Sequence, residues 1–328
     1  MEHIQACRML WQERENGGAC LYRLYGASPQ ICLPSQIAGR PLVEVAPYCF
    51  AKNPHMPPPP KIKETIVGEK QEVFFLKELC GTAVEEVIFP DSVKKIGGYA
   101  FYNCKNLRKI QMGLALREIG SDAFMNTISF HSLELRCGAF EESGIRQILS
   151  RISSDISVKF LTQDKTQALL FYPEYYETYD EIAPAHLFGR QIRGEGFRAR
   201  QRIKDGCVDF DGYDAIFPQA CVEETERVLG QMALGRLRYP CGLQEKCKNR
   251  YREYVKEHIG GIAARLVREK SLDTIQFLLE EELLSLAALS ECALLAAETG
   301  WTQGAAYILQ MAARKRETKK NRYEFDLD

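Results

Sequence analysis

The side chains that most often act as nucleophiles or hold metals in this 328-residue chain are its twelve cysteines and five histidines. The two closest cysteines, Cys241 and Cys247, have a spacing that matches no common zinc pattern, and no histidine stands at a matching distance. The histidines are scattered, at His3, His55, His131, His186 and His258. No G-x-S-x-G nucleophile motif occurs. We therefore expect reduced, buried thiols and no catalytic residue, metal site or cofactor.

Two further patterns match ligand-binding motifs only in part. Gly194, Glu195 and Gly196 have part of the spacing of a dinucleotide-binding loop, but no buried strand precedes them and no apolar helix follows. An acidic cluster also lacks the terminal Glu of a calcium-binding loop, and we interpret it as a solvated turn. The members of this cluster are Asp205, Asp209, Asp211 and Asp214.

Positive charge gathers in two short runs, although the whole chain is balanced. The chain has 43 Lys+Arg and 44 Asp+Glu, so its net charge excludes a protein that binds nucleic acid through a strongly basic overall charge. The first run, 190–204, contains Arg190, Arg193, Arg198, Arg200, Arg202 and Lys204, and the second is 314–322. Either run could attract a phosphate backbone, so a nucleic-acid-associated protein is the alternative hypothesis. We favour a solvated loop and a solvated helix end.

The strongest signal for the fold that positions these residues is an internal repeat. Segment 84–106 aligns with segment 107–129 when each residue is compared with the residue 23 positions later. The matched residues include Val87 and Ile110, Ile96-Gly97 and Ile119-Gly120, and Ala100-Phe101 and Ala123-Phe124. A period of this length predicts a solenoid, in which each repeat buries its apolar edge against its neighbours.

Each residue type within a repeat has a predicted role. Val87 and Phe89 are two positions apart and face the core from one side of a short strand. Pro90 ends that strand, because it cannot donate a ladder hydrogen bond. Gly97 marks a conformation or a close approach that a side chain would spoil. Phe101 fills the space between successive turns.

Degenerate copies flank the regular pair. The upstream copy lies between Ile31 and Phe50, and the four prolines Pro57–Pro60 after it predict an extended surface loop. A proline-recognising domain could bind such a loop, but a stiff insertion is the simpler interpretation. The downstream copy is shortened, and its expected core residues are Leu133, Leu135, Ala139, Phe140, Ile145 and Ile148.

The motif of the central repeats resembles the BspA-like leucine-rich repeat. Eight residues match the pattern of that family: Pro90, Val93, Ile96, Gly97, Ala100, Phe101, Cys104 and Leu107. The resemblance covers about 31–148, and it implies a curved right-handed solenoid with a binding role, often for proteins. The whole arrangement also resembles leucine-rich-repeat proteins with a helical C-terminus from gut anaerobic bacteria. Many relatives are secreted and have longer repeat arrays, whereas this chain has about four repeats.

The pattern changes after the repeats. Segment 156–218 mixes aromatic and β-branched residues with Gly, Pro and Asp, which predicts a β-rich cap on the open end of the solenoid. From 219 to 328 the pattern is helical, with helices expected at 223–237, 244–257, 261–268, 272–282, 285–299 and 303–316. Segments 270–279 and 300–309 form a weak second repeat, which predicts stacked helical hairpins that are ankyrin-like at most.

The sequence thus predicts an α+β fold in three parts. These are a leucine-rich-repeat solenoid with an N-terminal cap and a proline-rich insertion at 1–155, a β-rich capping segment at 156–218, and a helical domain at 219–328. The most apolar stretch, 283–297, is interrupted by Glu291 and is shorter than the roughly 20 residues that a membrane span needs. The N-terminus has no basic start followed by an apolar run. We therefore expect a cytoplasmic protein without membrane contact.

The expected function is that of a non-enzymatic scaffold that binds an unknown protein partner. The exposed positions of the repeat strands and the helical domain would supply two binding surfaces. The exposed strand positions are Glu86, Ile88, Arg108, Lys109 and Gln111.

Overall fold

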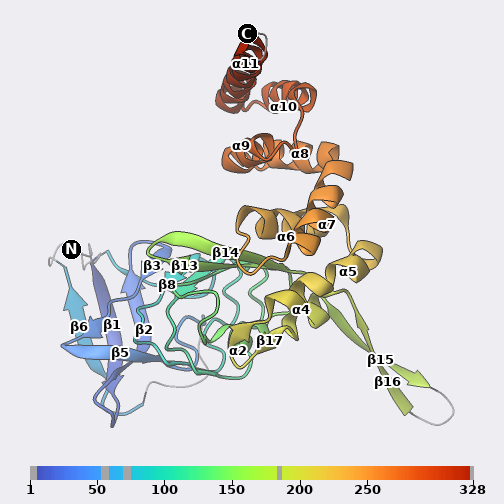
Figure 1. Cartoon of the computed structure of the whole chain (residues 1–328). Helices are drawn as coiled ribbons and strands as arrows, with labels where there is room; N and C mark the ends of the chain where they lie inside the picture. Colours follow the sequence, from blue (N-terminus) through green and yellow to red (C-terminus); the bar gives the residue numbers. More distant parts are fainter. Residues whose placement is uncertain (1–5, 53–58, 69–74, 183–186, 326–328) are drawn as a thin grey trace. The chain divides into compact units, whose positions relative to one another are not determined.

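The computed structural model describes the backbone of residues 6–52, 59–68, 75–182 and 187–325. The chain forms two compact units, Met1–Ala220 and Cys221–Asp328. The first contains two packed sheets and short helices, and the second is helical (Figure 1). The predicted α+β fold is confirmed. The division into three parts at residues 155 and 218 stays a prediction. Strands on both sides of residue 155 belong to one sheet.

Each repeat contributes one strand to a six-stranded sheet with the order β14-β13-β12-β10-β8-β3. Its strands are β3 (Gln30–Cys32), β8 (Glu86–Ile88), β10 (Lys109–Met112), β12 (Ser132–Leu135), β13 (Ile156–Thr162) and β14 (Lys165–Tyr172). All neighbours are parallel except β13 and β14. Lys109 is in register with Glu86 and with Ser132, so the 23-residue period sets the alignment of the strands.

The repeats that contain β3, β8 and β10 continue into β5, β9 and β11. These strands belong to an eight-stranded sheet with the main order β11-β9-β5-β2-β1-β6. Its strands are β1 (Cys7–Glu13), β2 (Ala19–Gly26), β4 (Gln36–Ile37), β5 (Arg40–Val45), β6 (Lys63–Val67), β7 (Lys77–Glu78), β9 (Lys95–Ile96) and β11 (Glu118–Ile119). β6 and β7 belong to the insertion, as does the short helix η1 (Gly81–Ala83) that follows them. Pro59 and Pro60 lie in its loop, whereas Pro57 and Pro58 lie outside the described residues.

The predicted core residues fill the interior of the solenoid. Val87, Phe89 and Phe101 are completely buried, as predicted. Phe50, Phe101 and Phe124 come from three repeats, and their rings stack with successive centroids 5.0 and 5.5 Å apart. Aromatic pairs of this geometry add to the energy gained by burial. The stack therefore joins one repeat to the next.

Glycine at the turn between the two sheets is required by a close approach of neighbouring repeats. A Cβ atom at Gly97 would overlap the backbone of Pro47, and one at Gly120 would overlap the backbone of Gly98. The predicted close approach at Gly97 is confirmed. Neither glycine has a positive φ, so it is lack of space, and not backbone conformation, that selects glycine here.

One predicted core residue of the shortened copy is wrong. Phe140 is 61% exposed and packs edge-on against Phe210, with ring centroids 5.3 Å apart. The repeat is cut short here by helix α2 (Ile145–Leu149), which buries Ile145 and Ile148 as predicted. Phe140 therefore has no position in the aromatic stack of the longer repeats.

Segment 156–218 is mixed, with short helices among its strands. After β14 it contains a separate two-stranded sheet, β15 (Tyr176–Ile182) and β16 (Leu187–Arg193), and the small pair β17 (Ile203–Lys204) and β18 (Cys207–Val208). Its helices are α3 (Gly196–Arg200) and α4 (Phe210–Ala215), and α5 (Phe217–Glu223) begins at its end. Because β13 and β14 extend the six-stranded sheet beyond β12, they cover the core of the last repeat.

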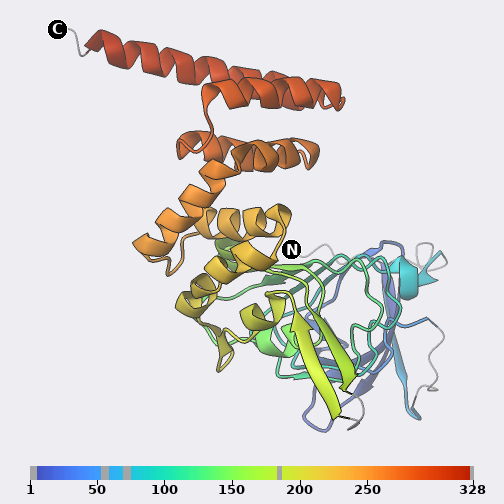
Figure 2. The same ribbon diagram turned by 90° about the vertical axis from the view of Figure 1, so that its right-hand side faces the viewer.

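The second unit is a stack of antiparallel helices (Figure 2). Its helices are α6 (Glu226–Arg238), α7 (Glu245–Glu257), α8 (Ile259–Arg268), α9 (Leu272–Glu280), α10 (Leu286–Glu298) and α11 (Thr302–Phe325). All six predicted helices are confirmed, with ends within a few residues, except that α11 continues to Phe325. α8 contacts α10 and α9 contacts α11, which confirms the predicted stack of hairpins.

The 30-residue period of the hairpins is visible in the backbone. Lys270 and Gly300 follow α8 and α10 and both have a positive φ, of 55° and 73°. After each, one N–H reaches back into the last helical turn: Ser271 donates to Leu266 and Trp301 donates to Ala296. This is the Schellman geometry that ends a helix, so both hairpins turn in the same way.

Candidate functional site

The five residues predicted as contacts lie together on the six-stranded sheet. Glu86 and Ile88 are on β8, Lys109 and Gln111 are on β10, and Arg108 directly precedes β10. Glu86 is in register with Lys109, and Ile88 with Gln111. These residues alternate with buried ones and are partly or fully exposed, because successive side chains of a strand point to opposite faces. Glu86, Ile88, Lys109 and Gln111 share the outward face of the sheet. Arg108 precedes its strand and pairs with Glu85 at 2.5 Å.

Lys109 is part of a row of alternating charges that crosses four strands. Its Nζ lies 3.8 Å from a carboxylate oxygen of Glu86 and 3.4 Å from one of Glu134 on β12. The other oxygen of Glu134 lies 3.3 Å from the Nζ of Lys159 on β13. We call Glu86, Lys109, Glu134 and Lys159 the charge ladder. Glu134 and Lys159 were not among the predicted contacts. Glu134 stands 23 positions after Gln111, but the period no longer holds between Glu134 and Lys159.

The charge ladder is neutral overall and is partly shielded from water. Two carboxylates alternate with two ammonium groups, and the Glu134 side chain is only 12% exposed. Ion pairs at exposed positions contribute only about 0–1 kcal/mol each to stability. The main effect of the ladder is to hold these long side chains in a defined order. A polar partner can exchange hydrogen bonds and ion pairs with such a surface.

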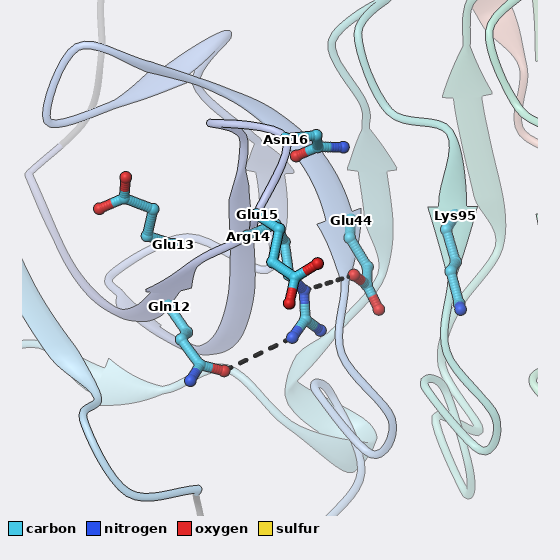
Figure 3. Close-up of a pocket in the computed structure, with 7 residues that line it drawn as sticks. All are labelled: Gln12, Glu13, Arg14, Glu15, Asn16, Glu44 and Lys95. Carbon is cyan, nitrogen blue, oxygen red and sulfur yellow. Dashed lines mark hydrogen bonds and ion pairs between the residues drawn. The ribbon is translucent and has the colours of Figure 1, made fainter.

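A hollow of about 670 Å³ lies beside the eight-stranded sheet (Figure 3). Its lining comes from β1, the turn after it, β5 and β9, and consists of Gln12, Glu13, Arg14, Glu15, Asn16, Glu44 and Lys95. The guanidinium of Arg14 lies between Glu44 and Gln12, donating at 2.6 Å to the first and at 3.5 Å to the second. Sequence reasoning missed this hollow, because it depends on pairing between the N-terminal strands and the first repeat.

The chemistry of the hollow is limited by how its groups are paired. Arg14 also donates to the Sγ of Cys20 at 3.1 Å, and burial raises the pKa of that thiol to about 12. Cys20 is therefore a protonated thiol at neutral pH and a poor nucleophile. Within the described residues, no three His, Cys, Asp or Glu side chains lie close enough together to hold a metal ion. The hollow is a polar surface depression.

The residues of the first basic run are dispersed and mostly paired. Arg190 pairs with Glu177 at 2.6 Å, Arg198 with the buried Glu195 at 2.6 Å, and Lys204 with Asp209 at 2.6 Å. Arg193 is exposed at the end of β16, and Arg202 is half-buried beside β17. The six residues therefore do not form one continuous basic surface.

Arg200 is a structural residue. Its guanidinium donates to the backbone carbonyls of Ser154, Pro173 and Gly196 at 2.5–3.0 Å, and burial lowers its pKa to about 10. A Cβ at Gly196 would overlap the Pro173 carbonyl, which explains one glycine of the partial dinucleotide motif by packing. In the acidic cluster, Asp209 caps α4 by accepting from the N–H of Gly212 at 2.9 Å.

The second basic run lies on α11, and only part of it can be described. The side chains of Arg314, Lys315 and Arg316 are described, and those of 317–322 lie outside the described side chains. Lys315 donates to the carbonyl of Leu279 at 2.9 Å, which fixes α11 against the end of α9. None of the helices in the described part of the chain is both long and apolar enough to span a bilayer.

Comparison with known proteins identifies the repeats. Residues 77–152 match the BspA type leucine-rich-repeat region in six copies. A leucine-rich cell surface protein from Faecalibacterium prausnitzii A2-165 is similar in structure, with 17% identity, a TM-score of 0.27, and coverage of 38% of this chain and 30% of that chain. A leucine-rich-repeat protein of T. pallidum is similar at 20% identity and a TM-score of 0.22, over 42% of this chain and 73% of that chain.

The chain thus spans less than a third of the length of the first structure. No curated protein matches its sequence. An origin in gut anaerobic bacteria stays an expectation from the resemblance. The family match falls on the segment in which strands recur at the 23-residue period and the aromatic rings stack. Residues 77–152 are therefore a BspA-type leucine-rich-repeat region.

Proposed function

We propose that this protein is a non-enzymatic scaffold that binds a protein partner on the outward face of the six-stranded sheet. The repeat family suggests a protein-interaction role. The observation that carries the proposal is the charge ladder, whose four side chains lie in order on strands about 4.8 Å apart. A rigid strand scaffold presents them with little loss of backbone entropy on binding.

The balance of charge favours a protein partner over a nucleic acid. A nucleic acid is bound chiefly by cations that replace its counterions, which requires uncompensated positive charge. In the ladder each ammonium group already faces a carboxylate. A protein surface can offer both signs of charge together with amides and hydroxyls, and polar groups of this kind form the rim of protein interfaces.

A cytoplasmic location is part of the same proposal. All twelve cysteines lie outside disulfide bonds, and most of them are buried or half-buried. Cysteines outside disulfides in this number favour a reducing compartment, because oxidising compartments convert thiols into disulfides. Thiol titration of the purified, unfolded protein without reductant checks this, and recovery of disulfides in place of thiols would contradict it.

A site-specific crosslink tests the binding face. A photo-crosslinking residue placed at Gln111 should capture a defined partner in native lysate, and the same residue at Glu118, on the other sheet, should not. Replacing Lys109 with Glu sets three carboxylates in a row and should abolish the capture. Lys94→Glu makes the same change of charge at an exposed position before β9 and should leave it intact.

Two results would overturn the proposed face. One is equal crosslinking from Gln111 and Glu118, which would show contact without specificity. The other is a Lys109→Glu protein that keeps its folded circular-dichroism spectrum and still captures every partner of the wild type. A partner captured only through Glu118 would move the binding surface to the eight-stranded sheet.

A further inference from the structure

The six-stranded sheet ends at β14, an edge strand whose sequence favours pairing with a further strand. Among the described residues, β14 pairs with β13 on one side, and no strand pairs with its other side. After Lys165 the strand contains no charged residue, proline or glycine. Uncharged, apolar edge strands add readily to other strands, so native proteins protect such edges.

A tyrosine hydroxyl covers this edge at Phe171. The Oη atom of Tyr213, on α4, donates to the carbonyl of Phe171 at 2.6 Å and accepts from the N–H of the same residue at 3.2 Å. In an antiparallel pair, a residue of the neighbouring strand exchanges these same two hydrogen bonds with its partner. The hydroxyl of Tyr213 therefore takes the place of one residue of a further strand.

Contacts with the last repeat hold α4 in this position. Phe210, the first residue of α4, packs edge-on against Phe140, with ring centroids 5.3 Å apart. Just before α4, the carbonyl of Gly206 accepts from the N–H of Ser143 at 3.0 Å. Tyr213 is completely buried. The exposed ring of Phe140 thus has a structural role, because it anchors the helix that carries Tyr213.

The edge that Tyr213 covers is complementary to the same edge of a second copy. It is regular over 168–172, after a register shift that leaves Gln167 without a ladder partner. The N–H and carbonyl of Phe171 point away from β13, and those of Leu169, two positions earlier, point the same way. A two-fold axis at Leu170 sets Leu169 of each copy opposite Phe171 of the other, and no charges oppose this pairing.

We propose that Tyr213 is an edge lock, which prevents β14 of one copy from pairing with β14 of another. Without the hydroxyl, the N–H and carbonyl of Phe171 lie buried beside an apolar ring, which is unfavourable for both groups. Displacement of α4 by the strand of a second copy restores both hydrogen bonds. The edge lock acts at the end of the sheet, and it does not depend on the proposed binding face.

Analytical ultracentrifugation of the full chain tests the edge lock. Tyr213→Phe removes the hydroxyl and keeps the ring, and its weight-average mass should rise with concentration to about twice that of the wild type at the same concentration. Tyr254→Phe is the matched control, because Tyr254 is also buried, at 8% exposed, but lies in the helical unit. It should sediment like the wild type. Circular dichroism shows that each variant is folded.

A second substitution separates edge pairing from a simple loss of stability. Proline has no N–H and is compatible with the outward side of an edge strand, where it blocks further pairing. Leu169→Pro added to Tyr213→Phe should therefore return the mass to the wild-type value, although the double variant is no more stable than the single one. Three results would each overturn the proposal: a folded Tyr213→Phe protein with the wild-type mass at every concentration, a double variant that still associates, or equal association of Tyr254→Phe.

Discussion

Phe50 and Phe101 stack with their ring centroids 5.0 Å apart and their planes 11° apart, although the inserted strands β6 and β7 lie between them in the chain. Tyr48 and Tyr99 stack in the same way, at 5.1 Å and 5°. The N–H of Phe50 also donates to the carbonyl of Ala100 at 2.8 Å. The chain therefore leaves the solenoid after the first repeat and returns in register. Loop-closure entropy grows slowly with loop length, so this insertion costs little.

Truncation of the central ring should unfold the solenoid at lower urea concentration. Phe101→Ala removes the ring that contacts both Phe50 and Phe124, and we expect a loss of about 3–5 kcal/mol in the free energy of unfolding. Trp11 fluorescence in a Trp301→Phe background reports on this unit alone, since the chain has two tryptophans. Phe140→Ala is the control and should have a small effect. Similar losses for both would contradict the stack as the main contact between repeats.

A single methyl group at the repeat contact should also be costly. Gly120→Ala would force its Cβ against the backbone of Gly98, so the two repeats must separate, and we expect a loss of about 1–3 kcal/mol in the free energy of unfolding. The same Trp11 assay measures it. Ser121→Ala changes the neighbouring exposed side chain and should be nearly neutral. A neutral Gly120→Ala would show that the repeats do not need this close approach.

The repeat period predicted the parts of the fold that depend on neighbours one period apart. Val87, Phe89 and Phe101 could be placed in the core because each has an equivalent 23 residues on. Phe140 was misplaced because its repeat is cut short by α2, a change of path that sequence matching does not reveal. The helices of the second unit were predicted well, because their apolar spacing is local.

The candidate site was predicted in part for the same reason. Glu86 and Lys109 could be placed on one face by alternation along the strand. The pairing of Lys109 with Glu134 and of Glu134 with Lys159 depends on how far these side chains extend between neighbouring strands. The hollow at Arg14 and Glu44 depends on antiparallel strands that precede the repeats. Contacts between segments that share no period leave no pattern in a single sequence.

The first basic run should not bind nucleic acid strongly. Arg190, Arg198 and Lys204 are paired with carboxylates and Arg200 is buried, so few cations are available to replace counterions. A gel shift with labelled duplex DNA and RNA at several salt concentrations should show weak retention that Arg190→Ala with Arg198→Ala leaves unchanged. A salt dependence equivalent to several phosphate contacts, lost in that variant, would favour the nucleic-acid alternative.

A glycine after α8 should stabilise the helical unit. Lys270 has a φ of 55°, a conformation that costs an L-residue about 1–2 kcal/mol, so Lys270→Gly should raise the free energy of unfolding by about 1 kcal/mol. The reciprocal change, Gly300→Lys, should lower it by a similar amount, since no atom lies within 4 Å of a Cβ there and only the backbone conformation is affected. Urea unfolding followed by Trp301 in a Trp11→Phe background measures both. Effects of the same sign would refute the argument.

Alkaline pH should destabilise the solenoid through its buried thiols. Burial raises the pKa of Cys104 from 9.0 to about 12, and its thiol donates to the carbonyl of Phe50 at 3.3 Å. Above pH 9.0 the unfolded chain loses this proton first, so the stabilising contribution is complete below about pH 9 and is lost as the pH rises towards about 12. The slope is about 1.4 kcal/mol per pH unit for each such thiol.

Urea unfolding in reductant should therefore show a shallower alkaline loss for Cys104→Ala than for the wild type. Cys32→Ala, at an exposed thiol, should keep the wild-type slope, and equal slopes for all three proteins would contradict the role of the buried thiol.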